Sequence, residues 1–124
     1  MALKVNILRN DEDQIVVCVL TGSLDTETYQ DFKSKAMICL EKSPRALSLD
    51  LKALEYISSM GIGAVLELHK AATARGTTFM MSNVPPHIEQ VFKIVHALPN
   101  VQMFESVAEA DRYFGEIQKR IKEK

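Results

Sequence analysis

The sequence predicts a single α/β domain, residues 1–124, with a mixed sheet of about five strands and about four helices. Strand-like and helix-like hydrophobic periods alternate along the chain after an initial pair of strands, and no linker or internal repeat divides it. A chain of 124 residues suits one compact domain with one core. The expected order is β-β-α-β-α-β-α-β-α, in which strand–helix–strand units require parallel strand pairs.

The first two strands are expected to form a hairpin. Leu3, Val5 and Ile7 alternate with polar residues, as on a half-buried strand. Residues 10–13 are a polar turn, and the valine-rich run 15–20 is typical of a central strand. The hairpin is therefore the predicted N-terminal edge of the sheet.

The third strand is expected between two helices. After a break at residues 21–23, Asp25 is placed to cap a first helix. The buried stripe of that helix comprises Tyr29, Phe32, Ala36, Cys39 and Leu40. Residues 46–51 predict the third strand. The second helix is expected from Ser59 to about residue 75, where Gly76 ends it.

The C-terminal part continues the alternation. Residues 77–81 predict a fourth strand, Pro85 and Pro86 open a third helix, and residues 101–104 predict a short fifth strand. A last helix is indicated by an apolar stripe of Val107, Ala110, Phe114, Ile117 and Ile121. The charged tail from about residue 118 to 124 is expected to fray.

Composition and charge exclude several classes of function. The net charge of −1 provides no basic field, so we expect no binding to nucleic acid. No apolar run approaches the roughly 20 residues that span a bilayer, so we expect no membrane insertion. The N-terminus lacks the apolar stretch of a signal peptide, and we expect a cytoplasmic protein, a monomer or weak dimer.

The cysteines and histidines do not indicate a metal site. Cys18 and Cys39 each lie within an apolar pattern, which favours buried free thiols over a disulfide. His69, His87 and His96 lack metal-ligand spacing with each other or with cysteine. No glycine-rich phosphate loop with a lysine is present, and we expect no cofactor.

The most informative segment is the predicted start of the second helix. Ser58 and Ser59 lie where free backbone N–H groups and the helix dipole favour an oxygen or a negative group. A serine there can be a cap, a catalytic nucleophile or an acceptor of phosphate. Sites in open α/β sheets gather at the C-terminal ends of strands. If the two preceding strands are parallel, the turn of Asp25 and the turn of residues 58–61 share one rim.

Two motifs resemble those of the STAS domain, as found in bacterial anti-sigma factor antagonists. Thr21-Gly22-Ser23-Leu24-Asp25 is similar to the family's turn after the second strand. Tyr56-Ile57-Ser58-Ser59-Met60-Gly61-Ile62-Gly63 is similar to the family's Ile/Met-Asp-Ser-Ser/Thr-Gly-Leu-Gly segment. Together with the order of elements, the resemblance covers almost the whole chain.

The resemblance implies a regulated binding protein rather than an enzyme. In antagonists of this family an anti-sigma factor, itself a serine kinase, phosphorylates the serine after the motif's aspartate, which is here Ser59. The unphosphorylated domain binds the kinase, phosphorylation breaks the complex, and a serine phosphatase resets it. Ser58 stands where the aspartate is usual, and Met60 stands where a small residue is usual.

The other residues of the segment have structural and functional interpretations that the sequence leaves open. Ser58 favours a cap, and Gly61 favours close approach of the helix to the neighbouring turn. Met60 and Ile62 are both candidates for an exposed apolar contact with a partner, although the helical spacing of Ile62 favours the core. Asp25 is a helix cap or, on the resemblance, a residue framing the site near Ser59.

Two rival functions remain at the level of sequence. Ser59-Met60-Gly61 is faintly similar to a nucleophile elbow, but Ile57 replaces the first glycine of that motif. No histidine lies in a context typical of a general base. The second rival is a non-switching STAS scaffold subunit of a signalling or transport complex, which would explain the missing aspartate.

Overall fold

The computed structural model describes residues 2–97 and 107–123. Their elements are β1 (Leu3–Asn10), β2 (Ile15–Leu24), α1 (Tyr29–Leu40), β3 (Ala46–Ile57), α2 (Ser59–Ala74), β4 (Thr78–Ser82), α3 (Pro86–Ala97) and α4 (Val107–Lys122). The predicted α/β class and the order of these elements are confirmed. The expected fifth strand, residues 101–104, lies outside the described residues.

The four strands form one mixed sheet in the order β1-β2-β3-β4. β1 and β2 are antiparallel, as a hairpin requires, whereas β2 pairs parallel with β3 and β3 parallel with β4. The parallel pairs follow from the helices α1 and α2, which carry the chain back to the start of the next strand. As a result, β2 and β3 end at the same rim of the sheet.

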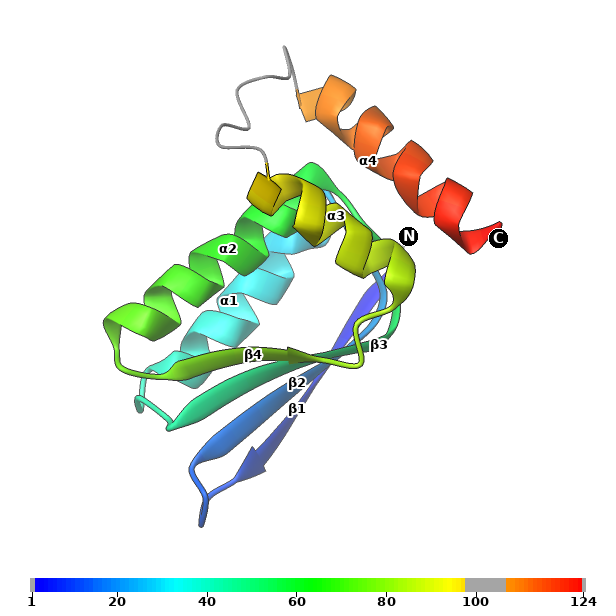
Figure 1. Ribbon diagram of the computed structural model, residues 1–124. Coiled ribbons are helices and arrows are strands. Elements are labelled where there is room, and N and C mark those ends of the chain that lie inside the picture. The colour runs from blue at the N-terminus through cyan, green and yellow to red at the C-terminus, as the bar shows by residue number, and fades with distance from the viewer. Residues whose placement is uncertain (1, 98–106, 124) are drawn as a thin grey trace.

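The core lies between the sheet and the helices α1 and α2, which cover the same face of it (Figure 1). Alternate residues of the strands point into this layer. Val16, Cys18 and Leu20 of β2 pair with or lie beside Leu47 and Leu49 of β3, and all are buried. The continuous apolar run of β2 therefore splits into an inner and an outer set, as a pleated strand demands.

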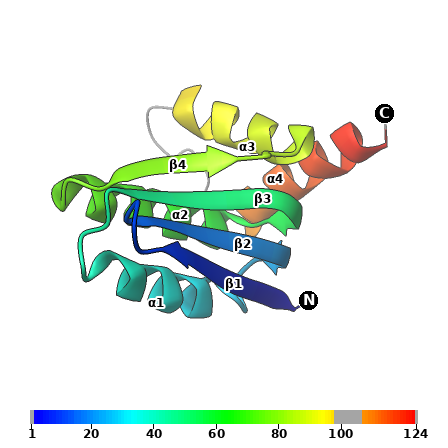
Figure 2. The same ribbon diagram turned by 90° about the horizontal axis from the view of Figure 1, so that it is seen from below.

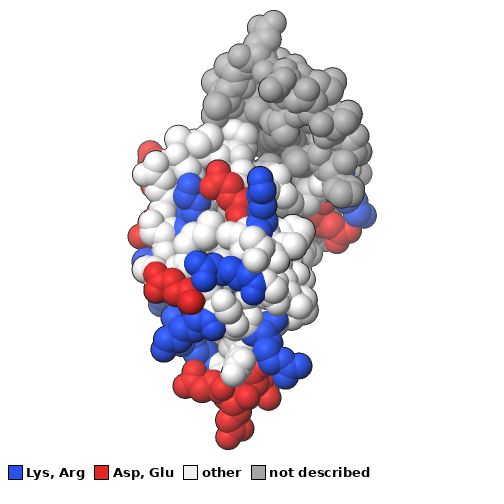
Figure 3. Space-filling view, turned by 90° about the vertical axis from the view of Figure 1, so that its left-hand side faces the viewer, with Lys and Arg blue, Asp and Glu red and all other residues white. Residues whose placement is uncertain are grey.

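The opposite face of the sheet is not covered by α1 or α2. Figure 2 shows the four strands side by side in front of these helices. Leu8 and Met80 belong to this face and are 52% and 43% exposed. On the face that Figure 3 shows, basic and acidic side chains are interspersed rather than separated into large fields. No described helix combines the length and the apolar character needed to cross a membrane.

Both cysteines are buried free thiols, as predicted. Burial raises the pKa of the Cys18 thiol to about 12, and the neighbouring Cys39 adds to the increase. Cys18 is therefore protonated at neutral pH and behaves as a small apolar side chain of the core.

Three boundaries of elements at the rim differ from the sequence prediction: the ends of β2 and β3 and the start of α1. β2 does not break at residues 21–23 but continues to Leu24 with irregular register. This is possible because Gly22 has φ +110, and a Cβ there would lie 2.2 Å from the oxygen of Ala2. β3 continues to Ile57, six residues beyond its predicted end at residue 51. α1 begins at Tyr29, one turn later than the prediction from Asp25.

The prediction that the tail frays from about residue 118 is wrong. α4 continues to Lys122, and the side chain of Gln118 is only 2% exposed. Its amide oxygen accepts from the Ile57 N–H at 2.9 Å, and its amide nitrogen donates to the Ile57 oxygen at 2.7 Å. Gln118 can be buried within a charged segment because the backbone at the end of β3 satisfies both polar groups of its amide.

The position of the core can be tested with two substitutions in α1. Phe32 is fully buried, so Phe32→Ala should lower the free energy of unfolding by about 3–5 kcal/mol through lost burial and a cavity. Ile38 lies on the same helix and is 57% exposed, so Ile38→Ala should change it by less than about 0.5 kcal/mol. Urea denaturation of both variants measures the difference, and equal effects would contradict the placement of α1.

Candidate functional site

The rim at the ends of β2 and β3 brings the two predicted turns together. Leu24 and Ile57 are partners in the parallel register, and both are fully buried. The N–H of Ser58 donates to the oxygen of Leu24 at 2.9 Å. The turn that begins at Asp25 and the start of α2 therefore lie side by side.

Ser58 is the N-cap of α2. Its backbone is extended (φ −93, ψ 174), and its Oγ accepts from the Gly61 N–H at 3.1 Å. Its carbonyl oxygen accepts the first regular helical hydrogen bond from the Ile62 N–H. The side chain is almost completely buried. The sequence-based interpretation of Ser58 as a cap is confirmed.

Ser59 is the first residue of α2 and lies on the rim beside the Asp25 turn. The residue as a whole is partly exposed, but its Oγ is buried. No acidic residue occurs in the first turn of the helix. A negative group placed on Ser59 would therefore meet the positive end of the helix dipole without a like charge from that turn.

Gly61 allows α2 to begin this close to β2. A Cβ on Gly61 would lie 2.5 Å from the oxygen of Leu24 and 3.0 Å from side-chain carbons of Leu24 and Ile57. The Leu24 oxygen is fixed, because it also accepts the Ser58 N–H. A side chain at residue 61 would thus push the helix start away from the turn, as the sequence pattern predicted.

Asp25 organises its own turn rather than capping α1 directly. Its Oδ1 accepts from the N–H groups of Glu27 and Thr28 at 3.0 and 3.1 Å. The N-cap of α1 is Thr28, without a side-chain capping bond. The Thr28 hydroxyl instead donates to the Ser23 oxygen at 2.8 Å. The predicted cap at Asp25 is therefore an Asx-type turn, which fixes the path of the chain beside Ser58.

Of the two apolar residues in the first turn of α2, only one can meet a partner. Met60 is partly exposed. Ile62 is 3% exposed and belongs to the core. Ile62 thus anchors the helix, while Met60 remains available as an adaptable apolar contact at the rim.

Two further side chains support the rim and were missed from the sequence. The first is Gln118, which bonds the backbone of Ile57. The second is His87, whose Nε2 donates to the backbone oxygen of Glu55 at 2.8 Å. Burial lowers the pKa of His87, which favours the neutral ring that donates this bond. The bonds join residues that are 61 and 32 positions apart, and no local pattern signals them.

The histidine of α2 is engaged elsewhere. His69, on α2, stacks on Phe79 of β4 with ring centroids 5.1 Å apart. Within the described ranges no group of three or more His, Cys, Asp or Glu side chains has the arrangement of a metal site.

The close approach at Gly61 can be tested against a second glycine of the same helix. Gly61→Ala should lower the free energy of unfolding by about 1–3 kcal/mol, because the added methyl overlaps the Leu24 oxygen. A Cβ on Gly63 meets nothing within 4 Å, so Gly63→Ala should raise it by up to about 1 kcal/mol. Thermal and denaturant unfolding measure both, and two stabilised variants would contradict the geometry.

Comparison with known proteins supplies the family. The model of the STAS domain matches residues 6–110. Among curated relatives, BtrV of Bordetella bronchiseptica, described as a proposed anti-sigma factor antagonist, is 27% identical over 82 residues. That match covers 66% of this chain and 71% of BtrV.

Solved structures show the same fold at low identity. An anti-sigma factor antagonist from Mycobacterium paratuberculosis has a TM-score of 0.62 at 18% identity, covering 90% of this chain and 95% of that one. The Bacillus cell fate determinant SpoIIAA in its phosphorylated form has a TM-score of 0.61 at 20% identity, covering 76% and 83%. The match to Mglu spans only 20% of that chain. Because the family model matches most of this chain, residues 6–110, the chain belongs to the STAS domain family.

Proposed function

We propose that the protein is an anti-sigma factor antagonist, and that phosphorylation of Ser59 switches off its binding to an anti-sigma factor. On this proposal the anti-sigma factor is itself the serine kinase, and a serine phosphatase restores the binding form. The observation that carries the proposal is the position of Ser59, at the first residue of α2 on the rim where β2 and β3 end.

The start of α2 can accept a phosphate without rearrangement of the sheet, α1 or α2. A phosphoserine carries roughly −1.5 to −2 charges at pH 7. The first amides of a helix and its dipole stabilise such a group, and the first turn of α2 contains no acidic side chain to oppose it. The domain would therefore remain folded after modification.

A partner packed on the same rim would not tolerate the phosphate. The first turn of α2 offers Met60 as a partly exposed apolar contact, whereas Ile62 is buried in the core. Covering a new dianion with an apolar surface costs free energy unless cations meet it. Loss of binding thus follows from local charge alone.

The serine at residue 58 is compatible with this switch. The Ser58 Oγ accepts the Gly61 N–H, which is the capping role that an aspartate could also perform there. The substitution removes a charge beside Ser59 and keeps the helix start in place. The phosphoacceptor geometry therefore does not depend on a carboxylate at residue 58.

The relatives support both the antagonist role and the existence of two phosphorylation states in this fold. BtrV bears the description of a proposed antagonist. SpoIIAA is described both in an unphosphorylated and in a phosphorylated form, and each form has a TM-score of 0.61 with this chain. A protein of this fold thus exists in both states of the proposed switch.

Incubated with its cognate serine kinase and ATP, the protein should gain one phosphate, on Ser59. Ser59→Ala should gain none. Ser58→Ala should still be labelled, although loss of the cap should lower its free energy of unfolding by about 1 kcal/mol. Intact-mass and peptide mass spectrometry measure the incorporation and its site.

The labelling experiment separates the alternatives. Label lost in Ser58→Ala and retained in Ser59→Ala would move the acceptor by one residue. An unlabelled parent protein, with a kinase active on another substrate, would favour the non-switching scaffold subunit.

Ser59→Asp should weaken binding to the anti-sigma factor by at least about tenfold while leaving the fold intact. Its charge at the helix start should change the free energy of unfolding by no more than about 1 kcal/mol, in the stabilising direction. Calorimetric titration and thermal denaturation measure the two effects on the same sample.

Ser34→Asp provides the matched control, because Ser34 is exposed in the interior of α1. It adds the same charge away from the rim and should bind as the parent does. Equal affinity of Ser59→Asp and the parent would show that charge at residue 59 does not control the interface. A weak effect would be remeasured with the phosphorylated protein, whose charge is larger.

A further inference from the structure

Near the rim, beyond the end of β4, side chains form hydrogen bonds with the backbone of β3. β4 pairs with β3 only at residues 46–50, so residues 51–57 continue beyond its end. Along that edge, His87 of α3 donates to the Glu55 oxygen, and Gln118 of α4 bonds both polar groups of the Ile57 backbone. A planar carboxamide carries an acceptor and donors like those of a peptide group. Gln118 therefore replaces one residue of a neighbouring strand.

This contact places α4 near the candidate site. Ile57 is two residues before Ser59, and α4 contacts the end of β3 and also α2. Figure 1 shows α4 beside the end of β3 and the start of α2. The hydroxyl of Ser59 is buried in this arrangement. A kinase needs that oxygen in line with its phosphate donor, so the site must open first.

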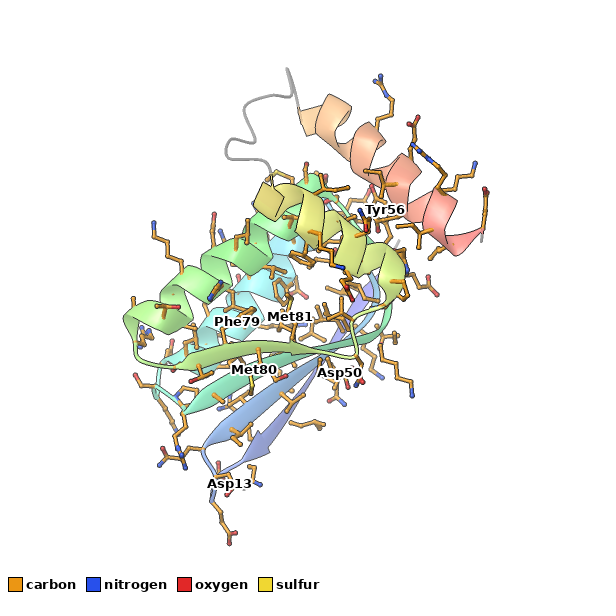
Figure 4. All side chains as sticks on the ribbon, in the orientation of Figure 1. Asp13, Asp50, Tyr56, Phe79, Met80 and Met81 are labelled. Carbon is orange, nitrogen blue, oxygen red and sulfur yellow. The ribbon has the colours of Figure 1, made fainter. Side chains whose placement is uncertain are left out.

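The contact between α4 and β3 is only partly packed. A cavity of about 410 Å³ lies between them, lined by Glu55 and Tyr56 of β3 and by Gly115, Gln118, Lys119 and Lys122 of α4. Tyr56 lies beside α4 in Figure 4, and a Cβ on Gly115 would touch its ring at 3.7 Å. α4 otherwise contacts α3 more than it contacts α2 or β3. The two hydrogen bonds of Gln118 attach it to the end of β3, where loss of one buried partner leaves backbone polar groups unsatisfied.

We propose that α4 is a detachable cover of the Ser59 site, and that Gln118 is the positioning residue that closes it. When the Gln118 amide leaves Ile57, α4 separates from β3 while the sheet, α1 and α2 remain folded, and the Ser59 hydroxyl becomes accessible. The proposal deepens the function proposed above and rests on it for its biological meaning. Separation of α4 from Ile57 and exposure of Ser59 can both be measured without a kinase.

Amide hydrogen exchange tests the attachment. In the unaltered chain, the Ile57 N–H should exchange together with the amides of residues 115–121, and faster than the N–H of Leu49 in the paired part of β3. In Gln118→Met, which preserves side-chain length without the amide, Ile57 should exchange about tenfold faster or more. Arg120→Ala, at an exposed position of the same helix, should leave the rate unchanged.

Accessibility of residue 59 is measured separately through a thiol. In Ser59→Cys, the introduced thiol should react slowly with iodoacetamide, and adding Gln118→Met should accelerate the reaction about tenfold or more. Adding Arg120→Ala should not. The parent chain gives the background from the buried Cys18 and Cys39, and peptide mass spectrometry assigns the modified residue. If Gln118→Met does not fold, Gln118→Asn keeps the amide but is one methylene too short to reach Ile57.

Each result decides one part of the proposal. An unchanged Ile57 exchange rate in both Gln118 variants would show that Gln118 does not hold α4. Faster exchange at Ile57 with unchanged reaction at residue 59, or fast reaction already in the Ser59→Cys parent, would show that α4 is not the cover. If both rates rise but no kinase labels Ser59, the cover stands and the proposed phosphorylation fails.

Discussion

The rim depends on how closely α2 approaches the end of β2. The oxygen of Leu24 accepts the Ser58 N–H at 2.9 Å, and this contact is possible only because Gly61 presents no side chain to the same oxygen. That contact fixes where the helix begins, and the helix start fixes where Ser59 lies relative to the Asp25 turn. A displacement of the helix start by the size of one methyl group would alter the surface that a partner meets.

Around this contact, neighbouring residues have separate tasks. Ser58 is buried and caps the helix, Ile62 anchors it in the core, and Met60 remains partly exposed. Ser59 lies between these structural residues, at the first position of the helix. On the proposed function, a charge added there has little effect on stability and a large effect on recognition, which is the property that a reversible switch requires. Because its oxygen is buried, the opening proposed for α4 would be a second point of control.

The sequence predicted what local patterns encode. Alternation along β1 and β2, the cap at Ser58 and the small residue at Gly61 all depend on neighbours within a few positions. It failed where tertiary contacts decide. The strand ends at Leu24 and Ile57 extend because each continues the other's pairing, and Gln118 is buried because a partner 61 residues away attracts it. A hydrophilic helix end gives no sign of such a partner, since the same residues would suit a solvated tail.

The long separation between Gln118 and Ile57 has a consequence for the order in which the molecule is completed. A ribosome delivers the chain from its N-terminus at about 5–20 residues per second. The strands and helices that build the rim therefore leave the ribosome before α4 does. If α4 is the cover proposed above, a rim that folds at this stage presents Ser59 uncovered, and its modification requires no opening step.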